Sequence, residues 1–456
     1  MRRRLPRGMG AQHIRLLVAL LALSGVSCAA GAPEGPAPGA VVAGGAGTVQ
    51  RPSYNTGNGF YVRDGKLYDA KGHEFRIRGV NRLHWDSGSA DGLVKSGSNT
   101  VRWDIDFTRP AAVNTAMVTL QSIDNGIVPI VGNWTATCNS DPSKLAAIVS
   151  TWVAQAPDWT KLDKYLILNV ANEWGPANSA VWRDSYVHAI AGLRAAGYTA
   201  PILIDSGGCG QDDADLLKYS QAVFESDPQR NVIFASHLYG GANDYSAAIQ
   251  SVRKGNPTVI TLAGNSPTHP FAPNYNGSNN SYSGLTAYHV DDAQGMTQLN
   301  GDHTALQNVG GVPGAWTVTL SVDSTHWDDF TGGGKLVDSG NYAFRIAQLA
   351  ALSRRTGAAF IIGEFGPGKN IGPSPTRVTP GQIITAADAN GIGWLAWAWD
   401  DNNLANCSSD DRWFSMTTRC GHYTQPSDLT SFGKDVVLDP GYGIAALAKR
   451  ASIFSR

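Results

Sequence analysis

The sequence predicts an α/β protein, a (β/α)8 TIM barrel with a small all-β domain inserted into it. Apolar segments of strand length recur eight times between residues 74 and 399, and most are followed by a segment with helical apolar spacing. Strands that alternate with helices favour a parallel sheet, and eight such units close this type of barrel. An open doubly wound sheet is the alternative, but the glycine-rich phosphate turn expected after one of its early strands is missing.

The first 29 residues have the layout of a secretory signal peptide. Several arginines precede the apolar run 16–23, which is too short to span a membrane comfortably, and small residues follow up to Ala29. The residues Gly-Val-Ser before Cys28 also resemble a loose bacterial lipobox, which would leave Cys28 acylated. We therefore expect a protein that is secreted or is anchored at the bacterial cell envelope by lipid at Cys28.

Composition limits the class of partner. The chain has 456 residues, 42% of them hydrophobic and 16% charged, so it can bury a large core. Its formal net charge is −1, and loss of the leader removes five arginines and no acid, which leaves −6. A chain of this charge disfavours a nucleic-acid partner. Beyond core packing, 13 Trp and 15 Tyr are enough to line a groove that stacks on sugar rings.

Two segments interrupt the alternation of strands and helices. Residues 30–53 are largely Ala, Gly and Pro, which indicates a linker. Residues 256–337 contain short alternating strands without a long helical pattern, which predicts a β module inserted between the sixth and seventh strands. Residues 54–255 and 338–456 then form the barrel.

The inserted segment has a resemblance of its own. Its stretches HVDDAQGMTQLNG and TVTLSVDSTHWDDFTGGG resemble small β-barrel modules of phage tail proteins, which are related to a half-domain of ubiquitin-activating enzymes. The segment contains no cysteine, so the resemblance implies no thiol chemistry. A contact with substrate or surface and a passive spacer remain open as its role.

Four cysteines follow the leader, and an even number in an exported chain predicts disulfides. Cys407 with Cys420 would close a short loop, and Cys138 could reach Cys209. No CxxC or HExxH spacing indicates a metal site, and we expect no cofactor. No pattern specifies a partner chain, and a monomer is expected.

Two glutamates that close apolar strands carry the functional prediction. Glu173 follows LILNVAN at the end of the fourth strand, and Glu364 lies in FIIGEFGPG at the end of the seventh. The carboxyl ends of barrel strands meet at one mouth, so both side chains should face it. A lone glutamate is usually a solvated surface charge, but a pair of this kind fits the proton donor and the ionised carboxylate of glycosidic cleavage. Their separation decides between retention and inversion of configuration, and the sequence does not measure it.

The motifs around these glutamates resemble glycoside hydrolase family 5 of clan A, with the bacterial endo-β-1,4-mannanase branch closest. The resemblance rests on NEWG at 172–175, HLYG at 237–240, IIGEFG at 361–366 and GWLAWAW at 393–399, supported by GLRAAGY, ILIDSGGCGQ and QAVFESDPQRNVIFASHLY. It covers residues 58–455 except the insertion. It implies a retaining, endo-acting hydrolase of β-1,4-linked polysaccharide, with mannan as the expected substrate.

The resemblance also implies roles for individual residues. Glu173 would be the acid/base and Glu364 the nucleophile. Asn172 would bond the 2-hydroxyl of the sugar, while Arg102 and Tyr239 would lie beside Glu364 and keep it ionised.

Further candidates would contact the sugar. His237 would bond hydroxyl groups or orient the acid, although a purely structural histidine is the alternative. Trp397 would stack under the sugar, with Trp399 on the same strand face and Trp394 turned to the core. A wider aromatic platform could include Trp85, Trp103 and Trp134.

One strand end departs from the family pattern. Where the family commonly has a histidine after the third strand, this chain has Gly132, Asn133 and Trp134, and the surroundings of His84 are also altered. With Arg102, these residues are the candidates that would choose between the axial 2-hydroxyl of mannose and the equatorial one of glucose. A cellulase or other β-glucanase is therefore one alternative, and a carbohydrate-binding surface protein without catalysis is another.

Overall fold

We describe the protein from a computed structural model. It describes residues 47–84, 91–105, 115–177, 179–211, 213–238, 342–367, 379–400, 414–419 and 421–454, together with five strands inside 256–337. The predicted signal peptide, the first part of the linker, Trp85, Tyr239, Cys407 and Cys420 lie outside these residues. Among the helices it describes, none is both long and apolar enough to cross a membrane.

Eight parallel strands form a closed barrel, as predicted. They are β3 (Arg78–His84), β4 (Thr100–Ile105), β5 (Val128–Asn133), β6 (Ile167–Asn169), β7 (Ile202–Asp205), β8 (Val232–Leu238), β14 (Ala359–Phe365) and β15 (Gly393–Ala396). Their order around the barrel is their order in the chain, and β15 closes the barrel by pairing Leu395 with Gly79 of β3. Glu173 follows the fourth strand and Glu364 lies on the seventh.

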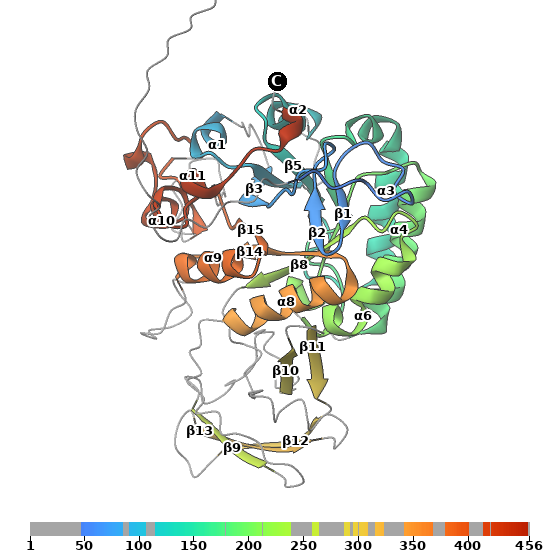
Figure 1. The fold of residues 1–456 in the computed structure, drawn as a ribbon, viewed down its shortest axis with the longest axis vertical. Coiled ribbons are helices and arrows are strands. Elements are labelled where there is room, and N and C mark those ends of the chain that lie inside the picture. The colour runs from blue at the N-terminus through green and yellow to red at the C-terminus, as the bar shows by residue number, and fades with distance from the viewer. Residues whose placement is uncertain are drawn as a thin grey trace, which may run out of the picture. The chain divides into compact units, whose positions relative to one another are not determined.

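Helices cover the outside of this barrel (Figure 1). The α3 helix packs against α4, α4 against α6, α6 against α8, and α8 against α9. The helices are α1 (Asp91–Ser96), α2 (Thr115–Asp124), α3 (Pro142–Trp159), α4 (Ala180–Ala195), α5 (Gly207–Gly210), α6 (Asp213–Ser226), α8 (Tyr342–Thr356), α9 (Pro380–Ala389), α10 (Ser431–Leu438) and α11 (Ile444–Leu447), with 3-10 turns η1 (Thr160–Leu162), η4 (Pro426–Asp428) and η5 (Ser452–Phe454).

Local sequence explains where these helices begin and end. The α3 helix begins after Asp141, whose side chain accepts a hydrogen bond from the Ser143 N–H, and α9 begins with a capping box between Thr379 and Gln382. The apolar stripe of α4 is buried, and the chain leaves this helix before Gly197, which has φ +98°.

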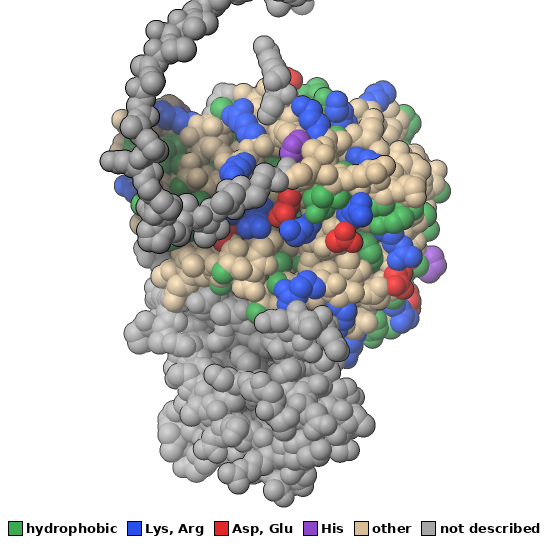
Figure 2. Space-filling view, in the orientation of Figure 1, with side chains coloured by type: hydrophobic (Ala, Val, Ile, Leu, Met, Phe, Trp, Pro, Cys, Tyr) green, Lys and Arg blue, Asp and Glu red, His purple; other side chains and the backbone are tan. Residues whose placement is uncertain are grey.

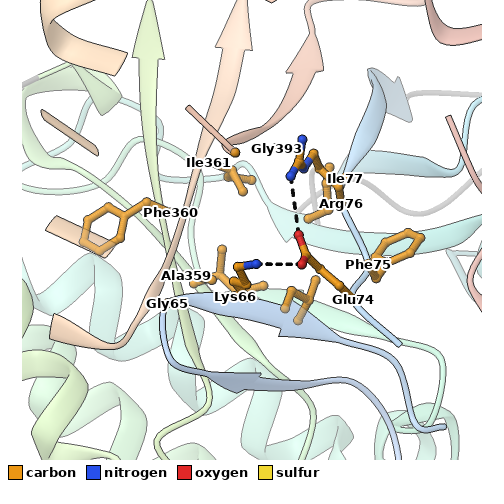
Figure 3. A pocket seen from close by; sticks show the side chains of 13 residues that line it. Gly65, Lys66, Glu74, Phe75, Arg76, Ile77, Ala359, Phe360, Ile361 and Gly393 are labelled. Atoms are coloured by element: carbon orange, nitrogen blue, oxygen red, sulfur yellow. Dashed lines mark hydrogen bonds and ion pairs between the residues drawn. The ribbon is translucent and has the colours of Figure 1, made fainter. Parts of the chain in front are cut away.

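A short hairpin lies against the starts of the barrel strands (Figure 3). Its strands, β1 (Tyr61–Arg63) and β2 (Lys66–Tyr68), are joined by Asp64 and Gly65, both with positive φ, as a tight hairpin turn requires. The pocket in Figure 3 lies between this hairpin and the first residues of β14 and β15. The Glu74 carboxylate accepts hydrogen bonds there from Lys66 at 2.8 Å and Arg76 at 3.4 Å. These three charged side chains of the pocket are therefore paired with one another.

Five strands are described in the segment between β8 and β14. They are β9 (Thr258–Ala263), β10 (Ala287–Asp291), β11 (Gly295–Leu299), β12 (Gly301–Asn308) and β13 (Ala315–Val322). Antiparallel pairing gives one sheet of β10 and β11 and a second in the order β12–β13–β9. A single compact module of the phage-tail type stays a prediction.

Charged side chains on the surface are dispersed. Figure 2 shows one face, on which Lys and Arg side chains of the described residues lie singly between acidic and apolar ones. Among the described residues, a dense group of charges is instead buried at the carboxyl ends of the barrel strands.

Candidate active site

A buried arginine connects the strand ends. Arg102 lies on β4 and is 0% exposed. Its Nη1 donates to Glu364 Oε1 at 2.6 Å, and its Nη2 donates to Asn172 Oδ1 at 2.6 Å and to Asp205 Oδ2 at 2.9 Å. One planar guanidinium therefore fixes side chains from three other strand ends, which a point charge on a lysine would not do.

The charge of Arg102 is secured by its surroundings. Burial alone would lower its pKa, but the carboxylates of Asp104, Asp205 and Glu364 raise the pKa above its ordinary value. The guanidinium thus stays positive and faces Glu364 directly. This confirms the predicted contact between Arg102 and Glu364, and it places Arg102 beneath the site instead of on a sugar-facing surface.

Glu173 has an unusual backbone conformation. It lies in the loop after β6 with φ +51°, in the left-handed region that residues other than glycine rarely adopt. Its N–H donates to Asp205 Oδ2 at 2.9 Å, and its carbonyl accepts from the Cys138 N–H at 3.2 Å. Contacts from two other segments of the chain therefore hold this conformation in place.

The two glutamates lie close together. A carboxylate oxygen of Glu173 and one of Glu364 are within 4.8 Å of each other, and the residues are only 9% and 3% exposed. In glycosidases, a separation of roughly 5–5.5 Å lets the second carboxylate attack the sugar, whereas roughly 6.5–9.5 Å leaves room for a water molecule. A pair of carboxylate oxygens this close agrees with the retaining arrangement.

The environment of Glu173 favours the protonated form. Burial is the largest effect and raises the pKa of this carboxyl, and the neighbouring charges of Glu364 and Asp205 raise it further. The hydrogen bond from His237 acts in the opposite direction without cancelling the rise. The surroundings of Glu364 differ from those of Glu173, because Glu364 accepts a charge-assisted hydrogen bond from Arg102. The site thus sets two similar carboxyl groups in two different environments.

The ring of His237 lies between the carboxyl groups of Glu173, Glu364 and Asp205. Its Nδ1 lies 2.8 Å from Glu173 Oε1 and 3.5 Å from Glu364 Oε2, and its Nε2 lies 3.7 Å from Asp205 Oδ1. Burial would lower the pKa of the imidazole, but Glu364 and Asp205 raise it to about 10. The ring is therefore a cation at neutral pH and donates a proton in its hydrogen bond to Glu173.

Glycines make room for this ring. A Cβ atom on Gly210 would lie 2.5 Å from His237 Nδ1, and one on Gly363 would lie 2.7 Å from Nε2. His237 is 0% exposed as a result. Of the two predicted roles, this position favours orientation of the acid over direct contact with sugar hydroxyls.

Glu173, His237 and Glu364 are also near enough to one another to hold a metal ion. Two features of the residues argue against that use. A protonated imidazole has no free nitrogen for a metal, and Arg102 already supplies a positive charge at Glu364. The set of residues fits proton donation by one carboxyl group beside an ionised one better than it fits binding of a metal cation.

Comparison with known proteins gives the family. Residues 68–265 match the model of the cellulase family, glycosyl hydrolase family 5. A mannan endo-1,4-beta-mannosidase of Salipaludibacillus agaradhaerens is 32% identical over 213 residues, which cover 42% of this chain and 68% of that protein. The chain belongs to glycosyl hydrolase family 5. It is therefore a retaining glycoside hydrolase, in agreement with the close pair of carboxylates.

Other relatives match over a smaller share of their length. Mannan endo-1,4-beta-mannosidases of Streptomyces lividans and Cellvibrio japonicus are 30% and 29% identical, over 40% and 42% of this chain. The chain spans about half the length of each, 51% and 50%. Among solved structures, a β-mannanase from Thermomonospora fusca has a TM-score of 0.57 at 21% identity and covers 88% of this chain and 100% of its own. That likeness supports the barrel fold.

Three polar residues of this family 5 site were given no role from the sequence. Asp205 ends the apolar strand APILID. A carboxylate at the end of an apolar strand is the same signal that identified the two glutamates. Asn169 interrupts LILNV, and its Oδ1 accepts from Arg102 Nη2 at 2.8 Å. Asp104 lies two residues after Arg102 on β4, fully buried, and burial raises its pKa to about 8 against the opposing charge of Arg102.

Asn169 and Asp104 explain why this chain departs from the family pattern at the end of the third strand, where it has Gly132. A Cβ atom on Gly132 would lie 2.7 Å from Asn169 Oδ1 and 3.0 Å from Asp104 Oδ1. Glycine at this position therefore leaves space for two polar side chains under Arg102. Next to it, Asn133 is 2% exposed and accepts hydrogen bonds from the N–H and the hydroxyl of Thr135.

The aromatic predictions have mixed outcomes. The rings of Trp134 and Trp397 lie 6.3 Å apart between centroids and pack with Phe414, separately from the main core. Trp394 is in the core, as predicted. Trp399 was predicted beside Trp397, but it is 0% exposed and donates to the Gly421 carbonyl, so its ring has no face for a sugar. The reason is that β15 ends at Ala396, after which strand alternation no longer applies.

Trp103 is likewise a core residue and not part of an aromatic platform. It is 0% exposed, and its Nε1 donates to Ser122 on α2. His84 is the last residue of β3, and the structure does not describe its side chain. Tyr239 and Trp85 lie outside the described residues.

The predicted disulfide between Cys138 and Cys209 is confirmed. It joins the loop after β5 to α5, the short helix after β7, and both cysteines have positive φ. Cys138 also contacts the Glu173 backbone, and Gly210 next to Cys209 contacts the ring of His237. The bond thus lies directly beside the proposed acid. Cys407 and Cys420 lie outside the described residues.

Proposed function

We propose that this family 5 hydrolase is an endo-β-1,4-mannanase. The observation that carries the chemistry is the pair of carboxyl groups with oxygens within 4.8 Å of each other, one with a pKa that burial raises and one that accepts a hydrogen bond from Arg102. The substrate class is supported by the relatives named mannan endo-1,4-beta-mannosidase. A related β-mannanase structure contains mannohexaose.

In the first proposed step, Glu173 gives its proton to the glycosidic oxygen while Glu364 attacks the anomeric carbon. The leaving chain departs as an alcohol, and a covalent glycosyl-enzyme ester forms on Glu364. In the second step, Glu173 removes a proton from water, which attacks the same carbon and releases Glu364. Two inversions give net retention.

Neighbouring residues would bind and orient the sugar. The Asn172 amide is fixed, because its Oδ1 accepts from Arg102 and its Nδ2 donates to Thr137 Oγ1 at 2.9 Å. The second hydrogen on Nδ2 is then available for the 2-hydroxyl next to the reacting carbon. Trp397, 9% exposed and packed near Trp134, would stack on the sugar ring.

The test measures reducing-sugar release from galactomannan, glucomannan, carboxymethyl cellulose and xylan, with NMR of the anomer that forms first. We expect turnover on the mannans with retention, a loss of about 10²–10⁴-fold in Glu173→Ala, and no turnover in Glu364→Ala. Glu74→Ala is the matched control, because Glu74 is paired with Lys66 at the opposite end of the barrel. Activity on carboxymethyl cellulose alone would make the protein a β-glucanase, and binding without turnover would make it a carbohydrate-binding protein.

We also propose that the protein is exported. The layout of the first 29 residues and the disulfide between Cys138 and Cys209 both suit an oxidising compartment. Mass spectrometry of the mature protein distinguishes cleavage after Ala29 from an acylated N-terminal Cys28. Detection of the intact leader on the cellular protein would contradict export.

The segment 256–337 is proposed as a separate β module of the type found in phage tail proteins. Its five described strands pair only with one another in two antiparallel sheets. Limited proteolysis of the full chain should cut near residues 256 and 337 and leave the segment protected. Rapid digestion of the segment itself would contradict a folded module.

A further inference from the structure

Asp205 is a residue of this site that has no role in the proposed reaction, although it contacts several of the groups that do. It is the last residue of β7, is 0% exposed, and lies below both glutamates. Its Oδ2 accepts from Arg102 Nη2 and from the Glu173 N–H, both at 2.9 Å. Its Oδ1 lies 3.7 Å from His237 Nε2. One carboxylate therefore contacts three groups that each touch Glu173 or Glu364.

The contact with the Glu173 backbone has a specific consequence. Glu173 adopts φ +51°, a conformation that a glutamate does not favour by itself. Its N–H would lose its hydrogen-bond partner if Asp205 were removed, and the backbone would then be free to relax toward an ordinary conformation. Such a change would turn the side chain away from the leaving oxygen, and small errors in the position of a reacting group are costly.

The contact with His237 acts on the same glutamate through its side chain. His237 Nδ1 lies 2.8 Å from Glu173 Oε1, and the ring is fixed on its other side by Asp205 and by close contacts with Gly210 and Gly363. Asp205 thus supports both the backbone and the carboxyl group of Glu173. No other described side chain contacts the Glu173 N–H.

We propose that Asp205 is a positioning residue that holds Glu173 in the geometry needed for proton donation to the leaving oxygen. The inference rests on the proposed role of Glu173 in the same site. It predicts that loss of Asp205 weakens cleavage where the leaving group needs a proton and spares cleavage where it does not.

Asp227 provides a matched control. It is also 0% exposed, binds an arginine, Arg194, through both oxygens at 2.9 and 2.8 Å, and accepts from the Asn231 N–H at 2.9 Å. It lies before the start of β8, at the opposite end of the barrel, and does not contact Glu173 or Glu364. Asp205→Asn and Asp227→Asn therefore disrupt similar buried ion pairs, of which only one supports the acid.

The experiment measures kcat/KM and the melting temperature for wild type and both variants. The substrates are mannohexaose and 2,4-dinitrophenyl β-mannobioside, whose phenolate leaves without protonation, and kcat/KM reports the first chemical step. In Asp205→Asn we expect kcat/KM to fall by about 10²-fold on mannohexaose and by no more than about fivefold on the aryl glycoside. In Asp227→Asn we expect the two substrates to change by the same small factor.

Equal losses on both substrates in Asp205→Asn, or the same substrate difference in Asp227→Asn, would overturn the proposal. If Asp205→Asn does not fold, Asp205→Glu replaces it, because it keeps the charge for Arg102 but displaces the oxygen from the Glu173 N–H. Failure of the proposed function is distinct: wild type would then leave mannohexaose intact, and the comparison would be repeated on the glycan that it cleaves.

Discussion

The two ends of the barrel use buried charges differently. At the strand starts, two ion pairs each join one acid to one base: Arg194–Asp227, which is buried, and Arg78–Asp388, which is partly exposed. At the strand ends, one arginine and one histidine face four carboxyl groups, namely Asp104, Glu173, Asp205 and Glu364. In a matched ion pair, the base keeps the acid ionised. Where acids outnumber bases, the neighbouring negative charges raise the pKa of some of the acids, and these can bind and release a proton.

The direction of the pKa shifts follows from this imbalance. Burial raises the pKa of both Glu173 and Asp104, the latter to about 8, so both hold protons more tightly than ordinary carboxyl groups. Asp205 is different, because Arg102 and His237 outweigh its burial and lower its pKa. The strand ends thus bring carboxyl groups with raised and with lowered pKa values together around Arg102.

Removal of the central cation should have the largest effect. Arg102→Met leaves several carboxyl groups without their cation, so we expect a loss of about 3–5 kcal/mol in the free energy of unfolding. Activity on mannan should fall by about 10²–10³-fold, as for removal of one preorganised donor. Arg194→Met should lose similar stability but keep its activity at low temperature. Comparable activity losses in both variants, measured below their melting temperatures, would remove the distinction between the two ends.

The disulfide should have the next largest effect. Cys138 and Cys209 are separated by 71 residues, and closing a loop of this length stabilises a protein by about 4 kcal/mol in the chain-entropy model. The double variant Cys138→Ser/Cys209→Ser should unfold at lower denaturant concentration in chemical denaturation. Because Cys138 contacts the Glu173 backbone, the kcat of the double variant should fall even under conditions in which the variant is fully folded. An unchanged kcat would show that the bond only stabilises the chain.

His237→Gln should change the pH profile as well as the rate. The alkaline limb of kcat/KM reports loss of the proton from Glu173, whose pKa burial raises above the ordinary value. The charged groups that face Glu173 are His237, Glu364 and Asp205, and His237 lowers its pKa. Loss of that cation should raise the pKa of Glu173 and move the alkaline limb to higher pH, while the rate falls by about 10–10²-fold. A shift to lower pH would contradict this arrangement of charges.

A pair of glycine variants should show the smallest effects. Gly132→Ala forces a Cβ atom to 2.7 Å from Asn169 Oδ1, which should cost about 1–3 kcal/mol in the free energy of unfolding and disturb Arg102. Gly192→Ala lies inside α4, where the nearest atom is 3.4 Å from the new Cβ, and should stabilise by about 0.5–1 kcal/mol. Thermal unfolding of both variants, with assays on mannan, checks the prediction. Equal stability of the two variants would contradict close packing at Gly132.

Sequence patterns identified the barrel and its main chemical groups because they depend on short segments. Eight apolar runs with helical segments between them predict the eight-stranded barrel, and the position of Glu173 and Glu364 after such runs predicts a common mouth. The contact of Arg102 with Glu364 and the pairing of Cys138 with Cys209 followed from a family resemblance and from a small number of possible pairs. Each strand, and each glutamate that follows its apolar run, is encoded within one short segment, whereas these two contacts join segments far apart in the chain.

Tertiary structure alone decided the features that join distant segments. The left-handed backbone of Glu173 is bonded to two distant segments, to Asp205 on β7 and to Cys138 in the loop after β5. Trp399 is buried because the segment around Gly421 and Tyr423 covers it, and no pattern near Trp399 predicts that. The pKa shifts require the sum of charges from several strand ends. By itself, the sequence therefore predicted which groups perform the chemistry, and packing of distant segments decided how far apart they lie and in which direction their pKa values shift.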